Sequence, residues 1–186
     1  MRFNDHSRLA GKHAFLSASQ YAWTNYTDEK LEDRYRTSLA AMKGTELHNF
    51  ASEAIRLGIK LPRSPKTLNM YVNDCIGFRM TPEQVIHYSD NAFGTADAIS
   101  FNKNLLRIFD LKTGITPASF RQLEVYVAFF CLEYQVKPAE IEMELRLYQN
   151  DEVLIHVPDL EDIMHIMGKV VAFDKKIDLL KMEALS

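Results

Sequence analysis

The sequence predicts an α/β protein in which a mixed β-sheet is flanked by helices, with a helical extension before the sheet and one helix after it. Two pairs of runs alternate apolar and polar residues around a short polar turn, as hairpin strands do. Helical periodicity precedes, separates and follows them. With 186 residues, 47% hydrophobic and 25% charged, the chain is long enough for one sizeable core. We expect one domain over 1–186, with a helical part at 1–83, the sheet and a central helix at 84–157, and a final helix at 158–186.

The first part of the chain is expected to be mostly helical. Ser17 can cap a short helix, and a longer one is expected to open at Thr27 and to end near Gly58. Gly44 lies inside the longer segment, where glycine costs about 1 kcal/mol relative to alanine. It therefore predicts either a break between two helices or the close approach of another backbone. After two prolines, another helix is expected over residues 66–80.

Residues 84–111 are expected to form strands that lead into a hairpin with its tip at Asn102-Lys103-Asn104. A two-residue turn would place Asp97 directly opposite Asp110, with side chains roughly 5 Å apart, whereas a three-residue loop would make them diagonal neighbours. Two carboxylates at that distance repel each other unless one is protonated or a cation lies between them, and Mg²⁺ is a usual occupant. Strand alternation adds Lys112 to the face of Asp110. The hairpin thus predicts a metal site beside an ammonium group.

The central helix is expected to start with Thr116 as its N-cap and Pro117 at its first position. Gln122 and Tyr126, four residues apart, share a face about 100° from the apolar stripe. That stripe consists of Phe120, Leu123, Val127 and Phe130.

A second hairpin is expected over residues 139–158, with its turn at Asn150-Asp151. Its first strand has an apolar face for the core and a charged face for solvent. The charged face comprises Glu140, Glu142, Glu144 and Arg146. The final helix, to about Ala184, offers an Ile- and Met-rich surface for packing or for a partner.

These residues resemble the RecB-type branch of the PD-(D/E)xK nuclease superfamily. The resemblance lies in Gly-x-x-Asp (Gly94 to Asp97), Asp-x-Lys (Asp110 to Lys112) and Gln-x-x-x-Tyr (Gln122 to Tyr126), preceded by His48 on a helix after Gly44. These features occur in the family's order over residues 44–126. The proline of the superfamily name is replaced by Ala96, and the RecB branch commonly has glycine at the start of this segment.

The resemblance implies a restriction-endonuclease-like core and a set of roles. His48, Asp97, Asp110 and the backbone carbonyl of Leu111 would bind Mg²⁺ or Mn²⁺. Lys112 would orient the attacking water or stabilise the phosphate in the transition state. Gln122 and Tyr126 would position the phosphate and the lysine. CRISPR-associated relatives hold an iron–sulfur cluster with four cysteines, and this chain has only Cys75 and Cys131, which we expect to be buried thiols.

The net charge of −3 gives no overall attraction for nucleic acid, so DNA contacts would come from local basic clusters. One candidate cluster comprises Arg56, Lys60, Arg63 and Lys66. A solvated helix end and loop is the other interpretation of these residues. No apolar run approaches the roughly 18 residues of a membrane span and no signal peptide is evident, so a cytoplasmic location away from membranes is expected.

The sequence therefore predicts a metal-dependent DNA nuclease, and an exonuclease that acts on ends or single strands in DNA processing, recombination or mobile-element replication. The chain has no Gly-x-x-x-x-Gly-Lys loop, so a helicase, an annealing protein or its own oligomer is expected as a partner. Two alternatives remain. One is a non-catalytic DNA-binding or assembly module with the nuclease fold, and the other is a structural phage or mobile-element protein that oligomerises through its last helix.

Overall fold

A computed structural model describes residues 4–9 and 11–184, and the chain divides into two compact units, residues 1–43 and 44–186. The first unit contains two 3-10 helices, η1 (Ser7–Leu9) and η2 (Ala18–Asn25), and the start of helix α1 (Asp28–Leu57). The short helix expected after Ser17 is thus a 3-10 helix, and the Ser17 side chain does not cap it. The Ser17 hydroxyl contacts that of Ser19 instead.

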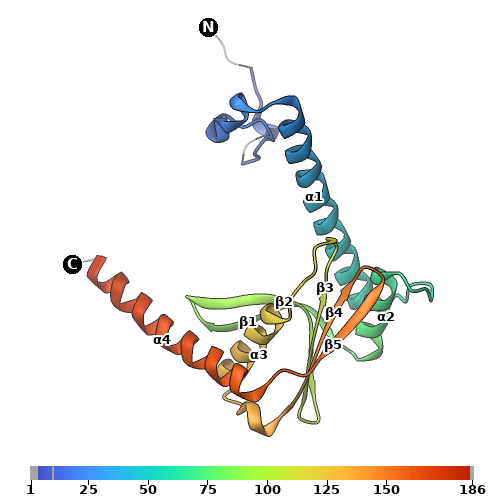
Figure 1. The fold of residues 1–186 in the computed structure, drawn as a ribbon, viewed down its shortest axis with the longest axis vertical. Coiled ribbons are helices and arrows are strands. Elements are labelled where there is room, and N and C mark those ends of the chain that lie inside the picture. The colour runs from blue at the N-terminus through green and yellow to red at the C-terminus, as the bar shows by residue number, and fades with distance from the viewer. Residues whose placement is uncertain (1–3, 10, 185–186) are drawn as a thin grey trace. The chain divides into compact units, whose positions relative to one another are not determined.

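The second unit holds the rest of α1 and all of the sheet. Its other elements are α2 (Thr67–Gly77), β1 (Thr81–Ser89), β2 (Ala92–Asn102), β3 (Leu105–Leu111), α3 (Arg121–Glu133), η3 (Pro138–Glu140), β4 (Glu142–Gln149), β5 (Glu152–His156) and α4 (Leu160–Ala184). The five strands form one sheet in the order β1-β2-β3-β4-β5 (Figure 1). Only β3 and β4 are parallel, because the connection through α3 returns the chain to the same end of the sheet.

The mixed sheet with flanking helices is confirmed, and it has five strands. Strand β1 begins at Thr81, inside the part expected to be helical, and α2 ends at Gly77 rather than Met80. The β4–β5 hairpin has the expected turn at Asn150-Asp151, and the β2–β3 hairpin has a two-residue turn, which is one of the two alternatives left open. Lys103 and Asn104 at one, and Asn150 and Asp151 at the other, have positive φ, as the turns that match strand twist require.

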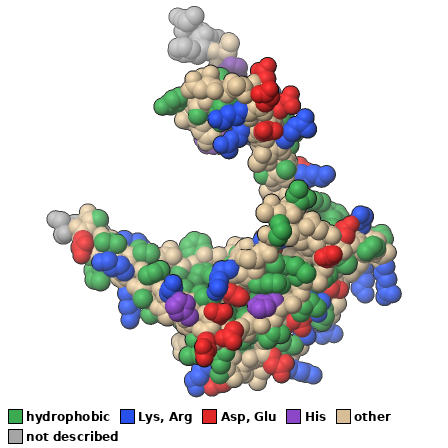
Figure 2. Space-filling view, viewed as in Figure 1, with side chains coloured by type: hydrophobic (Ala, Val, Ile, Leu, Met, Phe, Trp, Pro, Cys, Tyr) green, Lys and Arg blue, Asp and Glu red, His purple; other side chains and the backbone are tan. Residues whose placement is uncertain are grey.

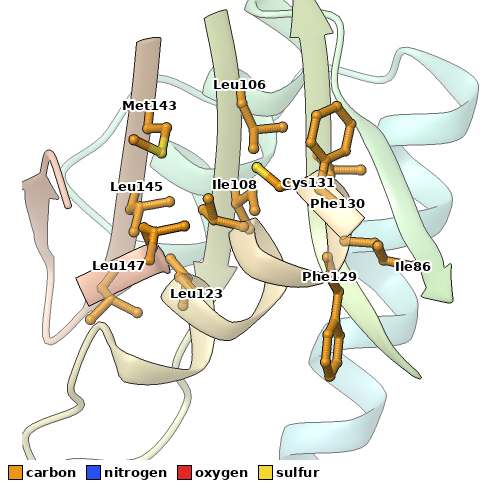
Figure 3. Packing of buried hydrophobic residues seen from close by; sticks show 14 residues of the cluster. Ile86, Leu106, Ile108, Leu123, Phe129, Phe130, Cys131, Met143, Leu145 and Leu147 are labelled. Atoms are coloured by element: carbon orange, nitrogen blue, oxygen red, sulfur yellow. The ribbon is translucent and has the colours of Figure 1, made fainter. Parts of the chain in front are cut away.

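Apolar residues cover both faces of the sheet. On one face α3 packs against β1, β2 and β3. Leu123 of α3 is fully buried in this cluster, close to Ile108 of β3 (Figure 3). Helix α4 joins this cluster through Ile163. On the other face α2 and the second half of α1 form a separate cluster, which includes Ala51, Ala54, Tyr71, Val72, Cys75, Phe109 and Tyr148. Cys75 and Cys131 are buried and unbonded, as expected. No helix in the described part of the chain is long and apolar enough to cross a membrane.

The charged face of β4 is not open to solvent over its second half, contrary to expectation. The side chains of Glu144 and Arg146 are only 20% and 15% exposed. The Arg146 guanidinium lies over the rings of Phe78 and Phe109 and binds Asp74 at 3.2 Å. An arginine paired with carboxylates and stacked on aromatic rings can be covered at low cost, so α2 packs on a face that looks polar in sequence.

The start of α3 was also predicted wrongly, since the helix begins at Arg121 and not at Thr116-Pro117. The buried Gln149 side chain holds the preceding segment in a loop. Its amide nitrogen donates to the carbonyls of Gly114 (2.6 Å) and Thr116 (2.8 Å), and its oxygen accepts from the Ala118 N–H (3.2 Å). Because these backbone groups already have partners, the loop needs no helical hydrogen bonds.

Candidate metal centre

Strand β2 changes its alternation at Asp97. Ala96 packs in the cluster under α3, whereas Ala98 packs in the cluster under α1 and α2. In a regular strand, residues two apart lie on one face, so the alternation shifts by one residue between them. Asp97 lies at this shift.

The β2–β3 register places Asp97 beside Asp110. The pairing runs from Asn102↔Leu105 to Ala98↔Phe109, so Asp97 and Asp110 directly follow the last pair, and the Asp110 carboxylate is close enough to raise the pKa of Asp97. The Leu111 N–H donates to Asp97 Oδ2 at 3.0 Å, and His48 Nδ1 lies 3.3 Å from the same oxygen. The structure therefore brings His48 and the Leu111 N–H to Asp97, whereas metal binding by Asp110 and by the Leu111 carbonyl stays a prediction.

Glu83 also joins this group, although it was not predicted from the sequence. The pairs Pro82↔Ala98 and Gln84↔Ala96 leave Glu83 opposite Asp97 on β1. Ligand atoms of His48, Glu83 and Asp97 all lie within 4.8 Å of one another, a spacing that could hold a metal ion. Glu83 has φ of 50°, a left-handed conformation that is unfavourable for a residue with a side chain. Its one signal in the sequence is an acid just before the expected strand at residue 84.

The carboxyl group of Asp97 is in an environment that disfavours its charge. Burial is the main cause, and the nearby carboxylates of Asp110 and Glu83 add to it, so the pKa of Asp97 rises from 3.8 to about 6. His48 and the Leu111 N–H oppose the rise. A divalent cation would reverse this balance, because it would favour the ionised carboxylates.

The polar residues expected to assist catalysis form one hydrogen-bonded chain. Lys112 Nζ donates to Asp110 Oδ1 at 3.1 Å and to Gln122 Oε1 at 2.9 Å. Gln122 Nε2 donates to the Tyr126 hydroxyl at 3.3 Å, and that hydroxyl donates to the Thr95 carbonyl at 2.6 Å. The lysine is thus held at a set position between β3 and α3. Burial is the main cause of a raised pKa at Tyr126, which keeps its hydroxyl protonated as a donor.

Two glycines make room for side chains of this site. A β-carbon on Gly94 would lie 2.9 Å from Tyr126 Cε1, and one on Gly44 would lie 2.8 Å from Thr113 Oγ1. Helix α1 continues through Gly44 without a break. Of the two expectations for Gly44, close approach therefore applies, and the neighbour is the Thr113 side chain rather than a backbone.

The donor set fits a small divalent cation. Carboxylate and carbonyl oxygens suit Mg²⁺, and an imidazole makes Mn²⁺ at least as suitable. Asp110 is 3% exposed, and its buried Oδ2 has no hydrogen bond, although Lys112 Nζ lies 2.9 Å away. A buried carboxylate oxygen with spare lone pairs is what a metal ligand needs. Acidic and histidine side chains lie together on the visible surface of the second unit (Figure 2).

The basic cluster is only partly as expected. Lys60 and Arg63 line a cavity of about 340 Å³ that Asp74 also borders. Arg56 is exposed at the end of α1. Lys66 pairs with Asp151 at 2.8 Å and so holds the β4–β5 turn against the start of α2. Lys66 thus has a structural partner, and DNA contact by the other three stays a prediction.

No protein-family model, curated protein or solved structure matches the chain. The resemblance to RecB-type nucleases thus stays a prediction from the residues that carry it. The geometry of the site is the basis for a functional proposal.

Proposed function

We propose that this protein is a divalent-metal-dependent DNA nuclease that acts as an exonuclease. One observation carries the proposal. His48 from α1, Asp97 from β2, Asp110 and Lys112 from β3, and Gln122 from α3 meet in one connected group. Ligands for a cation and a positioned ammonium side by side are the groups that phosphodiester hydrolysis requires.

The strand order supports the proposal that the sheet is a restriction-endonuclease-like core. Strands β1, β2 and β3 form an antiparallel meander, and α3 then leads to β4, which is parallel to β3. In this arrangement the Asp-x-Lys segment lies at the end of a central strand. Asp97 on β2 and Gln122 on α3 then lie close to the end of β3. The residues of the family's motifs would come together in this way.

A bound Mg²⁺ or Mn²⁺ would lower the pKa of a water molecule and neutralise charge on the scissile phosphate. His48, Asp97, Asp110 and the Leu111 carbonyl would hold it. Lys112 would place its ammonium group against the phosphate oxygens as negative charge develops there. Gln122 fixes the lysine by accepting a hydrogen bond from its ammonium group, and Tyr126 anchors Gln122 to β2.

Two features of the second unit support a preference for ends or single strands. They are its short hairpin turns and its negative net charge. Sequence-specific enzymes insert a helix or ribbon into the major groove to reach base edges. The three described hairpins, β1–β2, β2–β3 and β4–β5, are each joined by two residues, so none of them carries a long loop. Residues 44–186 carry a net charge of −5, which weakens capture of long duplex.

The test is digestion of linear and covalently closed circular DNA of one sequence, single- and double-stranded, with Mg²⁺, Mn²⁺ or a chelator. We expect metal-dependent shortening of linear DNA and intact closed circles. Asp110→Asn should be inactive, and Asp90→Asn, which changes an exposed carboxylate outside the site, should be active. Efficient nicking of circles would overturn the exonuclease assignment. Metal-independent binding without any cleavage would favour the non-catalytic module.

A further inference from the structure

Residues 4–9 and 11–43, the described part of the first unit, include many aromatic residues and form no buried core around them. No residue described within 4–43 is buried. Tyr21, Phe15 and Tyr35 are 71%, 37% and 49% exposed. Together with Trp23 and Tyr26 they line a cavity of about 890 Å³. Aromatic rings left at a surface in this number need a function other than filling a core.

Local contacts fix the orientation of these rings. Phe15 and Tyr35 meet edge to face with centroids 5.1 Å apart. Trp23 Nε1 donates to the Ser17 carbonyl at 2.9 Å, and Lys30 Nζ lies 4.8 Å from the centre of the Tyr26 ring. Rings held in place before a ligand arrives lose little conformational entropy when it binds.

The charge of this unit differs from that of the rest of the chain. Residues 1–43 contain seven lysines and arginines against five acids, a net charge of +2, while residues 44–186 have −5. Arg34 lines the cavity itself. The first unit is therefore the part of the chain that attracts an anion.

We propose that this cavity binds unpaired bases of single-stranded DNA by stacking. Sites for single strands combine cations that follow the phosphates with aromatic rings on which bases stack. A groove for an amphipathic protein helix is hydrophobic, whereas polar and charged side chains, including His13, Gln20 and Arg34, also line this cavity. Duplex DNA keeps its bases stacked inside the helix, so it offers no base faces to these rings. The choice of DNA over RNA rests on the proposed nuclease function.

Trp23 is the single tryptophan of the chain, so its fluorescence reports on this cavity alone. The full chain in chelator, where no metal-dependent cleavage occurs, is titrated with a 15-nucleotide oligothymidylate. We expect Trp23 quenching by the single strand, with weaker binding of a duplex of mixed sequence and of oligouridylate. Tyr21→Ala and Tyr35→Ala should each weaken binding by roughly 5- to 150-fold, the range for loss of one base stack.

Three controls separate this proposal from others. Tyr21→Phe keeps the ring and should bind normally, and Tyr134→Ala removes an exposed tyrosine of the second unit and should have no effect. In Asp110→Asn the oligothymidylate should quench Trp23 fluorescence as it does in the parent. Loss of cleavage can therefore be distinguished from loss of base binding in the cavity. Arg34→Gln should weaken binding and reduce its salt dependence.

The proposal is overturned if oligothymidylate leaves Trp23 fluorescence unchanged, or if Tyr21→Ala and Tyr35→Ala bind as tightly as the parent. Tighter binding of oligouridylate would overturn the assignment to DNA. A concentration-dependent change in Trp23 fluorescence without DNA, removed by Tyr21→Ala, would instead identify a second copy of the chain as the occupant.

Discussion

The ring of Tyr126 occupies the space that a side chain at Gly94 would need, with Tyr126 Cε1 2.9 Å from the position of an added β-carbon. The glycine of the Gly-x-x-Asp segment and the tyrosine of Gln-x-x-x-Tyr are thus one packing unit. The contact links β2 to the residue that anchors Gln122, and through it Lys112.

Gly94→Ala should therefore lower cleavage by displacing Tyr126, while Mn²⁺ affinity stays near that of the parent. A double-mutant cycle with Tyr126→Ala measures the coupling. In the Tyr126→Ala background, Gly94→Ala should lower the cleavage rate much less, because the ring that it would displace is absent. Additive losses in the cycle would show that Gly94 acts by another route.

Asp110→Asn and Lys112→Ala should separate metal binding from chemistry. Asp110→Asn should abolish both, because it removes a charged ligand from a buried site. Lys112→Ala should keep Mn²⁺ binding in calorimetric titration but lower cleavage by roughly 10²-fold or more, as loss of a positioned electrostatic group does. Cleavage at the parent rate by Lys112→Ala would show that the lysine has no part in catalysis.

His48→Ala should raise the Mn²⁺ concentration needed for half-maximal cleavage by at least about tenfold, since even indirect support of a ligand is worth that much. His87→Ala is the matched control, because His87 is on β1 and half-exposed next to Asp90. Equal Mn²⁺ requirements for the two variants would assign His48 a structural role only.

Asp97 gives the metal-free protein a characteristic pH dependence. With its pKa raised from 3.8 to about 6, the folded state binds more protons than the unfolded state between these values, so stability falls as pH rises through this window. Asp97→Asn should stabilise the metal-free protein at pH 8 by about 1–3 kcal/mol and give little gain near pH 4. Thermal unfolding in chelator measures this difference. A variant less stable than the parent at pH 8 would contradict it.

Glu83→Gly should have opposite effects on stability and on metal binding. Glycine adopts positive φ without the cost of about 1 kcal/mol that other residues incur, and the change also removes repulsion of Asp97. We expect a more stable metal-free protein that binds Mn²⁺ more weakly. Glu83→Gln keeps the backbone strain. It should also bind Mn²⁺ weakly, but it should lack the gain in stability that glycine provides. Unchanged Mn²⁺ affinity in both variants would remove Glu83 from the site.

The parts of the fold that were predictable depend on local signals. Polar turns locate the β2–β3 and β4–β5 hairpins, so the approach of Asp97 to Asp110 could be expected from the chain, whether as directly opposed or as diagonal neighbours. Helical spacing likewise put Gln122 and Tyr126 on one face. These contacts need only short-range geometry.

The errors come from contacts between residues far apart in sequence. Gln149 holds a loop more than 30 residues before it, so Thr116-Pro117 looks like a helix start although no helix begins there. Glu83 meets Asp97 only through the β1–β2 pairing, whose register shifts at its turn. The alternation of β4 predicts that Arg146 faces solvent. It is covered because its guanidinium lies over the rings of Phe78 and Phe109, which are distant in sequence.

The two thiols have a practical consequence for every metal titration. Burial raises the pKa of Cys131 to about 11 and that of Cys75 further still, so both remain protonated at neutral pH. Metals and oxidants react with thiolates, which are scarce here. Manganese uptake therefore has no thiolate contribution, and the protein can be handled without thiol reducing agents, which would otherwise complex the added ion.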